Sequence, residues 1–375
     1  MASLNRNTEP KNLAIVGAGI MGRCLAWRLS GYEHRITLFD KDSKNHGSAA
    51  AYTAAGMLAP FSELEAAEDN IFLLGQHSIA LWRDWLEVWN AEDLMAESGT
   101  LVLAHRQDIG SLHNFNQQLE AKLNALAGQQ KEALLLSKQQ LSELAPELAQ
   151  HFDQATFLKS EAYLDNHAVM DCMAKQLETA DIKWRENCEV RSISDNQLVS
   201  DNGAEAFDHI FDCRGLGAKN DIQSLRAVRG EVIRVYSKEV RLKHMVRLMH
   251  PRYRLYLVPK PNYEYVLGAT QIESEDYSPL SVRSALELLS ALYTIHPGFA
   301  EARIVESQSN CRPARPDNQP LIKHSKGLSQ INGLFRHGFL LAPALADITA
   351  RLFHGECQKN VELARLSEAM IDSQE

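Results

Sequence analysis

Two short apolar runs flank a glycine turn near the start of the chain, at residues 13–16 and 36–40. The first run, Leu-Ala-Ile-Val, has the composition of a buried strand, and the small and apolar residues after the glycines favour a helix. The second run, Ile-Thr-Leu-Phe-Asp, predicts another strand. This order predicts a βαβ unit at the amino terminus.

Two long segments further along the chain show helical periodicity. Residues 71–89 form an amphipathic pattern in which Trp82, Trp85 and Trp89 recur at i, i+3 and i+7. Such spacing is typical of a core stripe rather than of a ligand cage. After a strand predicted at 100–104, the Leu- and Gln-rich region 111–148 is also expected to be helical, with a boundary at Pro146.

Predicted strands dominate the centre of the chain, between the amino-terminal βαβ unit and a late helical segment. This strand-rich block lies between elements of nucleotide-binding type at both ends, so we expect an α/β protein with two domains whose segments alternate along the chain. The predicted elements are a hairpin-like pair at 182–193 and 198–203, strands at 209–218, 230–236, 254–260 and 263–270, and a helix at 281–295.

Composition and charge exclude several classes of protein. The 375 residues are 45% apolar and 23% charged, which is enough to bury a sizeable core. A net charge of −9 predicts no affinity for nucleic acid or for an anionic membrane. The polar amino-terminal segment lacks the apolar core of a signal peptide, and no run of about 18 apolar residues could span a membrane.

The six cysteines are scattered along the chain without C-x-x-C spacing. This pattern argues against a zinc site and against the disulfide framework of a secreted protein. We therefore expect no metal centre and a cytoplasmic location.

The glycine turn of the βαβ unit reads G-x-G-x-x-G, formed by Gly17, Gly19 and Gly22. In a dinucleotide fold the first glycine makes a tight turn, the second lets the backbone approach a pyrophosphate, and the third allows helix and strand to pack closely. Asp40 ends the second strand, where a carboxylate accepts hydrogen bonds from a ribose diol and repels a 2′-phosphate. The unit predicts NAD or FAD rather than NADP.

Two further segments bear on the cofactor. The small-residue run Gly-Ser-Ala-Ala-Ala-Tyr-Thr-Ala-Ala-Gly-Met-Leu-Ala-Pro at 47–60 would let the backbone lie flat against a planar ring, or would form a tight crossing between domains. Near the carboxyl terminus, Arg336 and His337 stand at a glycine-flanked turn before an apolar helix. A helix amino terminus offers free N–H groups and suits an anionic group.

Six motifs occur in an order that resembles the D-amino-acid oxidase superfamily of FAD enzymes, most closely the glycine oxidases of thiamine biosynthesis. The similarity extends from about residue 13 to residue 353. It implies a Rossmann-like FAD-binding domain of glutathione-reductase type and a second α+β domain on a mainly antiparallel sheet. The motifs are the G-x-G-x-x-G turn, TAAGMLAP, RGEVIRV, YLVPK with VLGAT, CRPARPDNQPLI and FRHGFLLAPALA.

The resemblance also implies a division of the chain and a set of FAD contacts. The FAD-binding domain would comprise residues 1–85, 150–220 and 310–375, and the substrate domain residues 86–149 and 221–309. The pyrophosphate would lie on the glycine turn, the ribose on Asp40, the flavin ring on the small-residue run, and the pyrimidine edge of the ring near the late turn. The implied contacts are Gly17, Gly19, Ile20, Met21, Gly22, Asp40, Ala54, Ala55, Gly56, Met57, Val190, Gly215, His337, Gly338, Phe339, Leu340 and Leu341.

Arg312 aligns with the arginine that binds the substrate carboxylate in this family, and Arg336 with a second arginine near the active site. A guanidinium offers two parallel donors to a carboxylate, which suits such a role. Tyr256 is a candidate hydroxyl donor to the same carboxylate. The alternatives are an inter-strand or interdomain salt bridge for Arg312, a carboxylate partner at the rim for Arg336, and sheet packing for Tyr256.

The chain departs from the family pattern at three positions. Thr53 replaces the histidine that some amine dehydrogenases link to flavin. Cys311 lies near a flavin-linking cysteine of sarcosine oxidases, but its surroundings resemble glycine oxidase, so we expect non-covalent FAD. Gln271 stands where some glycine oxidases carry an apolar residue. A polar side chain at this position would admit a secondary amine or another small amino acid as substrate.

The implied activity is oxidative deamination of glycine or a similar small amine by hydride transfer to FAD. O2 would reoxidise the flavin to give H2O2, and the imine product would supply thiazole synthesis for thiamine. A dehydrogenase that passes electrons to a quinone or carrier and a redox-inert flavoprotein scaffold are the alternatives. We expect no nucleic-acid or membrane partner, and self-association into a homo-oligomer is left open.

Overall fold

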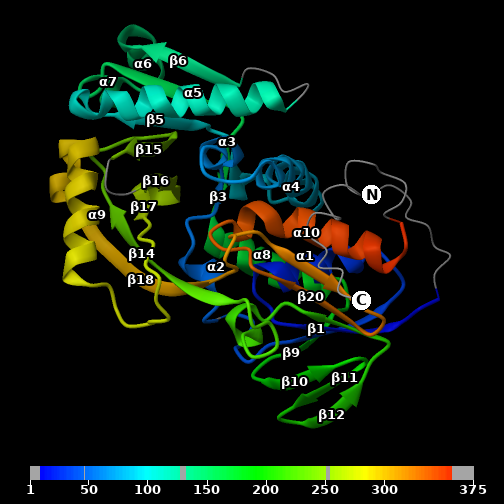
Figure 1. Ribbon diagram of the computed structural model, residues 1–375. Coiled ribbons are helices and arrows are strands. Elements are labelled where there is room, and N and C mark those ends of the chain that lie inside the picture. The colour runs from blue at the N-terminus through cyan, green and yellow to red at the C-terminus, as the bar shows by residue number, and fades with distance from the viewer. Residues whose placement is uncertain (1–8, 46, 127–131, 251–253, 357–375) are drawn as a thin grey trace.

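The computed structural model describes residues 9–45, 47–126, 132–250 and 254–356. Two large sheets organise these residues, one of six strands and one of eight. The ribbon shows the two sheets in separate regions of the molecule, with the chain passing between them several times (Figure 1). The predicted fold class, an α/β nucleotide-binding fold with a second, mainly antiparallel sheet, is confirmed.

The six-stranded sheet has the order β19-β20-β13-β1-β2-β9 and contains the predicted βαβ unit. All neighbouring strands are parallel except β19 and β20. In chain order the strands are β1 (Asn12–Val16), β2 (Arg35–Phe39), β9 (Lys183–Arg185), β13 (His209–Asp212), β19 (Leu321–His324) and β20 (Leu328–Asn332).

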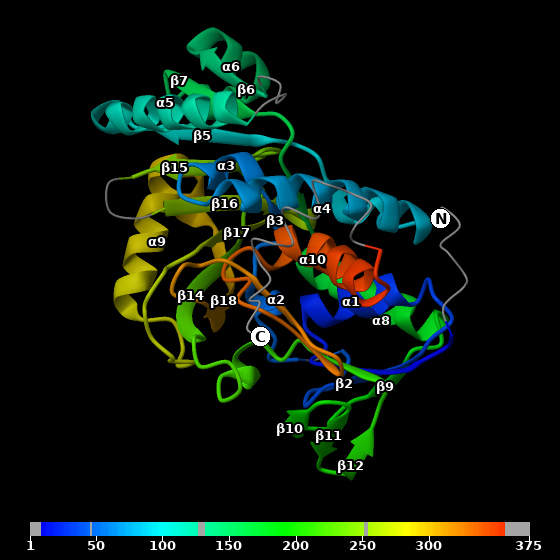
Figure 2. The same ribbon diagram turned by 45° about the vertical axis from the view of Figure 1, so that its right-hand side comes forward.

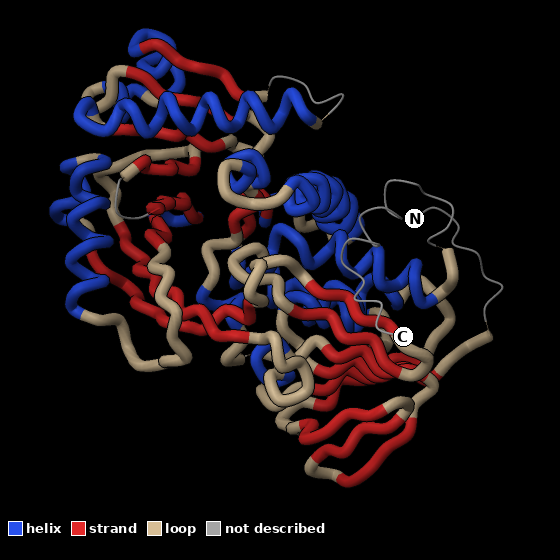
Figure 3. The backbone as a smooth tube through the Cα atoms, in the orientation of Figure 1, coloured by secondary structure: helices blue, strands red, loops and turns tan. Residues whose placement is uncertain are grey.

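Strand alternation gives this sheet two apolar faces. Leu13 and Ile15 of β1 pack into the large helical core, whereas Ala14 and Val16 face a smaller cluster on the other side. The helices on the first side are α1 (Ile20–Leu29), α4 (Asp69–Val88), α8 (Asn166–Thr179) and α10 (Gly338–Phe353). The other side is covered by a small antiparallel sheet of β10 (Val190–Ser194), β11 (Gln197–Ser200) and β12 (Gly203–Ala206) (Figure 3).

The eight-stranded sheet has the order β18-β14-β17-β16-β15-β5-β7-β6 and is antiparallel except between β5 and β15. Its helices are α5 (Ile109–Ala125), α6 (Lys138–Leu144), α7 (Pro146–Ala149) and α9 (Val282–Ile295); Figure 2 labels α5, α6 and α9, and Figure 1 labels α7. Its strands are β5 (Thr100–Ala104), β6 (Ala133–Ser137), β7 (Gln154–Leu158), β14 (Arg226–Tyr236), β15 (Met245–Met249), β16 (Arg254–Lys260), β17 (Glu264–Gly268) and β18 (Arg303–Ala314).

Short elements connect the two regions. The small-residue run forms helix α2 (Ala50–Thr53) and strand β3 (Met57–Leu58), followed by helix α3 (Pro60–Leu64). Strand β3 pairs with β8 (Ala162–Leu164), which also pairs with β4 (Met95–Ala96). The 3₁₀ turns are η1 (Glu92–Leu94), η2 (Arg106–Asp108), η3 (Gly215–Ala218), η4 (Pro261–Tyr263) and η5 (Pro297–Glu301).

The expected helix over 111–148 is wrong in its middle. Helix α5 accounts for its first half, but residues 133–137 form strand β6, which pairs with β7 along its whole length. Leu134 and Leu135 remain about half exposed on this edge strand, 47% and 60%. The Leu-rich segment has helical propensity, but pairing with a neighbouring strand overrides it. The boundary at Pro146 is confirmed, because α7 begins there.

The predicted strands of the central part of the chain differ from the observed ones in two places, because distant segments pair with each other. Residues 183–185 of the expected hairpin join the six-stranded sheet next to β2, and only β10 and β11 pair as a hairpin. Strand β15 was not predicted. The predicted stripe of tryptophans is buried: Trp82 and Trp85 of α4 are 0% and 7% exposed, and Trp89, the C-cap of the helix, is 6% exposed.

The proposed domain boundaries stay a prediction. β7 follows residue 150 yet belongs to the eight-stranded sheet, and β18 continues past residue 310 in the same sheet. None of the helices in the described part of the chain is long and apolar enough to cross a membrane.

Candidate functional site

A cavity of about 1580 Å³ is lined by residues from both large sheets. Every residue proposed above for FAD or substrate lines it, with the exceptions of Gly22 and Leu341. The walls come from the glycine turn and from residues 53–57, 213–217, 268–272, 310–313 and 334–340. The cavity therefore brings together segments that lie far apart in the sequence.

The glycine turn has the geometry that a pyrophosphate needs. Gly17 has a φ of +99°, and a Cβ there would lie 2.6 Å from the carbonyl oxygen of Cys213. A Cβ on Gly22 would lie 1.8 Å from the carbonyl oxygen of Gly17, so Gly22 serves the packing of α1 on the turn. A Cβ on Gly19 would meet nothing closer than 3.7 Å, which leaves the start of α1 open to the cavity.

Asp40 lines the cavity at the end of β2. Its Oδ2 accepts a hydrogen bond from the Ala18 N–H at 2.5 Å, and its Oδ1 accepts one from the Asp42 N–H at 2.8 Å. Burial raises the pKa of Asp40. Each carboxylate oxygen can accept a further hydrogen bond, so the arrangement is compatible with a ribose diol.

The small-residue run forms one side of the cavity. Gly56 has a φ of +71°, and a Cβ there would lie 2.4 Å from the carbonyl oxygen of Leu164. The buried Lys260 donates to the carbonyl oxygens of Ala55 and Leu164, at 2.7 and 2.6 Å, and ties the run to β16. Burial lowers the pKa of Lys260 to about 7. Ala54, Ala55 and Gly56 thus line the cavity with small side chains or none, which leaves room for a planar ring.

The late turn faces the cavity through His337, Gly338, Phe339 and Leu340. His337 is the N-cap of α10, so the N–H groups of the next three residues have no partner within the helix. Leu341 is fully buried instead, and its N–H donates to the carbonyl oxygen of His337 at 2.8 Å. The helix terminus thus offers its free donors to the cavity, as expected for a site that stabilises negative charge.

A buried carboxylate that the sequence pattern did not predict joins three of the cavity residues. Glu63 of α3 forms an ion pair with Arg336, and its Oε2 lies 3.1 Å from His337 Nε2. The hydroxyl of Tyr256 donates to Glu63 Oε1 at 3.1 Å. Burial opposes ionisation, but Arg336 and His337 hold the pKa of Glu63 well below its usual range. We call Glu63, Tyr256, Arg336 and His337 the Glu63 cluster.

The helix that carries Glu63 is held by a second buried carboxyl group. Glu161 accepts hydrogen bonds from the Ser62 N–H at 2.5 Å and from Ser62 Oγ at 2.8 Å. Arg247 donates to the carbonyl oxygen of Ser62 at 2.5 Å and pairs with Glu65. Burial raises the pKa of Glu161 to about 7. The position of Glu63 therefore depends on contacts that α3 makes with Glu161, in the loop between β7 and β8, and with Arg247 of β15.

Arg312 has very different surroundings from Arg336. Its Nη1 donates to the carbonyl oxygen of Thr270 at 3.1 Å, and within the described residues no carboxylate forms an ion pair with it. Burial, and then the nearby Arg336, lower the pKa of Arg312 to about 10, so the side chain is still cationic at neutral pH. An uncompensated guanidinium that lines a cavity has the charge and the donors that suit an anion.

Gly230 of β14 makes room for this guanidinium. A Cβ at Gly230 would lie 2.1 Å from Arg312 Nη2 and 2.3 Å from its Cζ. The arginine side chain therefore lies directly on the backbone of the neighbouring strand. Val228 and Arg312 are register partners between β14 and β18, so Arg312 reaches along the sheet toward Gly230.

Cys311 lies on the other face of β18. Strand alternation turns its side chain away from that of Arg312, and its Sγ lies 3.6 Å from the carbonyl oxygen of Asp276 and 3.8 Å from that of Ser274. Burial raises the pKa of this thiol, which makes it a poor nucleophile. These contacts support non-covalent FAD, which stays a prediction.

Three comparisons with known proteins agree with this geometry. A family model described as an FAD-dependent oxidoreductase (DAO) matches residues 12–352. An oxidoreductase of Rhizobium etli, named for thiamine biosynthesis (ThiO), is 36% identical over 341 residues, which cover 90% of this chain and 95% of that protein. A glycine oxidase of Geobacillus kaustophilus is 25% identical over 362 residues, which cover 92% and 93% of the two chains.

The crystal structure of glycine oxidase from Geobacillus kaustophilus superimposes with a TM-score of 0.80 over 93% of this chain and 96% of that one, at 24% identity. This similarity supports the fold. Because the family model matches residues 12–352 and a relative of 36% identity covers 90% of the chain, the chain belongs to the DAO family of FAD-dependent oxidoreductases, and FAD is its cofactor.

Proposed function

We propose that this protein is an amino-acid oxidase that acts on glycine or a similarly small amine bearing one carboxylate. The observation that carries the proposal is the uncompensated guanidinium of Arg312 in the cavity wall. FAD, when bound, supplies the acceptor for the hydride of the substrate α-carbon. The side chains of this protein then need only bind and orient the substrate.

The charges around the cavity support a substrate with a single carboxylate. Arg336 is neutralised by Glu63, and burial lowers the pKa of His337, so that the histidine is neutral at pH 7. Of Arg312, Arg336 and His337, only Arg312 then carries a charge that is left to pair with a substrate anion. A bidentate contact to Arg312 would fix the substrate by one end.

Tyr256 and Arg336 take supporting roles in this proposal. The Tyr256 hydroxyl has one proton, which it donates to Glu63. Toward the substrate this hydroxyl would therefore act as an acceptor, for example of a hydrogen bond from the amine, and not as a donor to the carboxylate. Arg336 forms an ion pair with Glu63, and the Glu63 carboxylate in turn forms hydrogen bonds with Tyr256 and His337. The cluster gives the cavity a fixed polar wall beside the free donors of α10.

We further propose that O2 takes the electrons as H2O2 and that the imine product serves a thiazole-forming reaction. The name of the Rhizobium etli relative, which refers to thiamine biosynthesis, supports this placement. The substrate could also be a secondary amine, because Gln271 lines the cavity next to Thr270 with an exposed side chain.

The test is a peroxide assay on the purified FAD-loaded protein with glycine, sarcosine, D-alanine, methylamine and iminodiacetate. We expect peroxide from one or more of the monocarboxylate amines and little from methylamine, which lacks the anion that Arg312 would bind. Methylamine turning over as well as glycine would contradict the proposal. Reduction of the flavin by glycine without peroxide would identify a dehydrogenase instead.

A further inference from the structure

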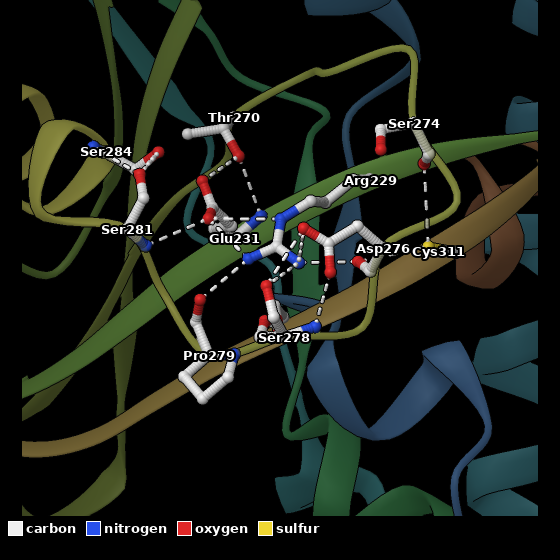
Figure 4. Close-up of polar contacts among 11 residues, drawn as sticks. Arg229, Glu231, Thr270, Ser274, Asp276, Ser278, Pro279, Ser281, Ser284 and Cys311 are labelled. Carbon is white, nitrogen blue, oxygen red and sulfur yellow. Dashed lines mark hydrogen bonds and ion pairs between the residues drawn. The ribbon is translucent and has the colours of Figure 1, made fainter.

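A loop at residues 270–281 joins β17 to α9 and forms part of the cavity wall. Two buried charged residues of β14, Arg229 and Glu231, lie against this loop with 3% and 0% of their surface exposed. Figure 4 shows them surrounded by loop residues. Neither of them lines the cavity.

Glu231 holds Thr270 through three contacts. Its backbone N–H donates to Thr270 Oγ1 at 2.9 Å, and its backbone carbonyl accepts from the Thr270 N–H at 3.3 Å. The Thr270 hydroxyl donates to Glu231 Oε2 at 3.0 Å. The position of the Thr270 carbonyl is thus fixed by both the backbone and the side chain of Glu231.

Arg229 fixes the carboxylate of Glu231 and the far end of the loop. Its Nη2 donates to Glu231 Oε1 at 2.8 Å and to the carbonyl oxygen of Pro279 at 2.9 Å. Its Nη1 donates to the carbonyl oxygen of Asp276 at 2.5 Å, and the same group lies 3.3 Å from the Asp276 carboxylate. The Ser281 N–H also donates to Glu231 Oε1, at 3.3 Å. Both ends of the loop are therefore anchored to one ion pair (Figure 4).

The opposite face of β14 forms part of the cavity wall. Residues 229 and 231 point to the loop, whereas Gly230 between them faces the cavity and lies under Arg312. The Thr270 carbonyl accepts the hydrogen bond from Arg312 Nη1. A continuous series of contacts thus runs from Arg229 through Glu231 and Thr270 to the Arg312 guanidinium.

We propose that Arg229 and Glu231 are positioning residues that set the orientation of the Arg312 guanidinium through Thr270. The inference rests on the proposed function, in which Arg312 binds the substrate carboxylate. A guanidinium binds a carboxylate bidentately only when its plane is correctly turned. The Thr270 carbonyl takes one of its five N–H donors and so fixes that plane, while Gly230 supports it from below.

The test compares Thr270→Val, Glu231→Gln and Arg229→Met with wild type, using the FAD-loaded protein. The probe is acetate, whose Kd is measured from the change that it causes in the flavin absorbance spectrum. We expect Thr270→Val, Glu231→Gln and Arg229→Met each to raise the Kd for acetate and the KM for the amino-acid substrate about fivefold to tenfold, with kcat changed less than twofold. A tenfold change corresponds to about 1.4 kcal/mol, the upper range for a lost hydrogen bond.

Two matched variants control for general effects. Thr270→Ser keeps the hydroxyl and should restore near wild-type binding. Arg226→Met removes another arginine of β14, one that pairs with the exposed Glu273 of the same loop and has no contact with Glu231 or Thr270 among the described residues, and this variant should bind acetate normally. Arg226→Met therefore distinguishes orientation of Arg312 from a general tethering of the loop.

Unchanged acetate binding in Thr270→Val and Glu231→Gln would overturn the proposal, and so would an equal loss in Thr270→Val and Thr270→Ser. Arg312→Ala is measured in the same series. If Arg312→Ala weakens acetate binding while the other variants do not, the positioning role is wrong and the proposed function stands. If Arg312→Ala has no effect either, both are wrong.

Discussion

Arg312 and Arg336 face one cavity from two neighbouring segments, the end of β18 and the turn before α10, which are joined by a hydrogen bond from the Phe335 N–H to the carbonyl oxygen of Pro313 at 2.9 Å. Arg336 is paired with Glu63 and belongs to a hydrogen-bonded cluster, whereas Arg312 meets only a backbone carbonyl among the described residues. A buried cation is costly unless something compensates it. Arg336 is therefore compensated by the protein itself, and the proposed function assigns the compensation of Arg312 to the substrate.

Removing the carboxylate from the Glu63 cluster tests this comparison with the largest expected effect. Glu63→Leu leaves Arg336 buried and unpaired, which should lower the free energy of unfolding by about 3–5 kcal/mol. Urea unfolding of the FAD-loaded protein measures it. Glu97→Gln, which breaks an exposed ion pair with Arg83, should cost less than about 1 kcal/mol. A similar small cost for both variants would show that Glu63 does not compensate Arg336.

The second prediction compares two buried carboxyl groups, Glu63 and Glu161. Glu161 has no Lys or Arg ion-pair partner among the described residues, and burial raises its pKa to about 7. Because the folded protein then holds a proton that the unfolded chain releases above its ordinary pKa of 4.5, this group contributes stability at low pH that is lost as pH rises to about 7.

Glu161→Gln should remove that pH dependence. Relative to wild type, its free energy of unfolding should rise by about 3 kcal/mol between pH 4.5 and pH 8, since each pKa unit corresponds to about 1.4 kcal/mol. Urea unfolding at the two pH values measures the change, with Glu97→Gln as the exposed control. A constant difference between Glu161→Gln and wild type would mean that Glu161 is ionised throughout.

The third prediction concerns the support beneath Arg312. Gly230→Ala places a methyl group in the space of the guanidinium, so the side chain must move. Overpacking of this kind costs about 1–3 kcal/mol, and we expect the KM for the substrate to rise about tenfold while FAD stays bound. Gly110→Ala in α5, where a Cβ would meet nothing within 4 Å, is the control. An unchanged KM in Gly230→Ala would place the substrate away from Arg312.

The parts of this protein that sequence could predict are local. The strand, glycine turn, helix and acid of residues 13–40 follow one another directly, and each has a residue type that the backbone geometry requires. The start of α10 after Arg336 and the boundary at Pro146 were likewise visible, because proline and glycine restrict or free the backbone at the positions where they occur.

The parts that sequence could not predict depend on distant contacts. Glu63 meets Arg336 across 273 positions of the chain, and nothing in the segment around Glu63 marks it as a partner. The sequence shows Gly230 only as a glycine within a strand. Its role becomes apparent from the structure, in which the Arg312 guanidinium occupies the space that a side chain at residue 230 would need. The strand at 133–137 also required a partner, β7, to overcome a helix-favouring sequence.

The central claim is that Arg312 binds the carboxylate of the substrate. Its most direct test is the Kd for acetate in FAD-loaded Arg312→Ala, measured from the flavin spectrum beside Arg303→Ala, which removes an exposed arginine from the other end of β18. Losing a charge-assisted pair of hydrogen bonds worth about 1.5–3 kcal/mol should weaken acetate binding at least tenfold in Arg312→Ala and leave it unchanged in Arg303→Ala. Equal acetate binding by Arg312→Ala and wild type would contradict the account.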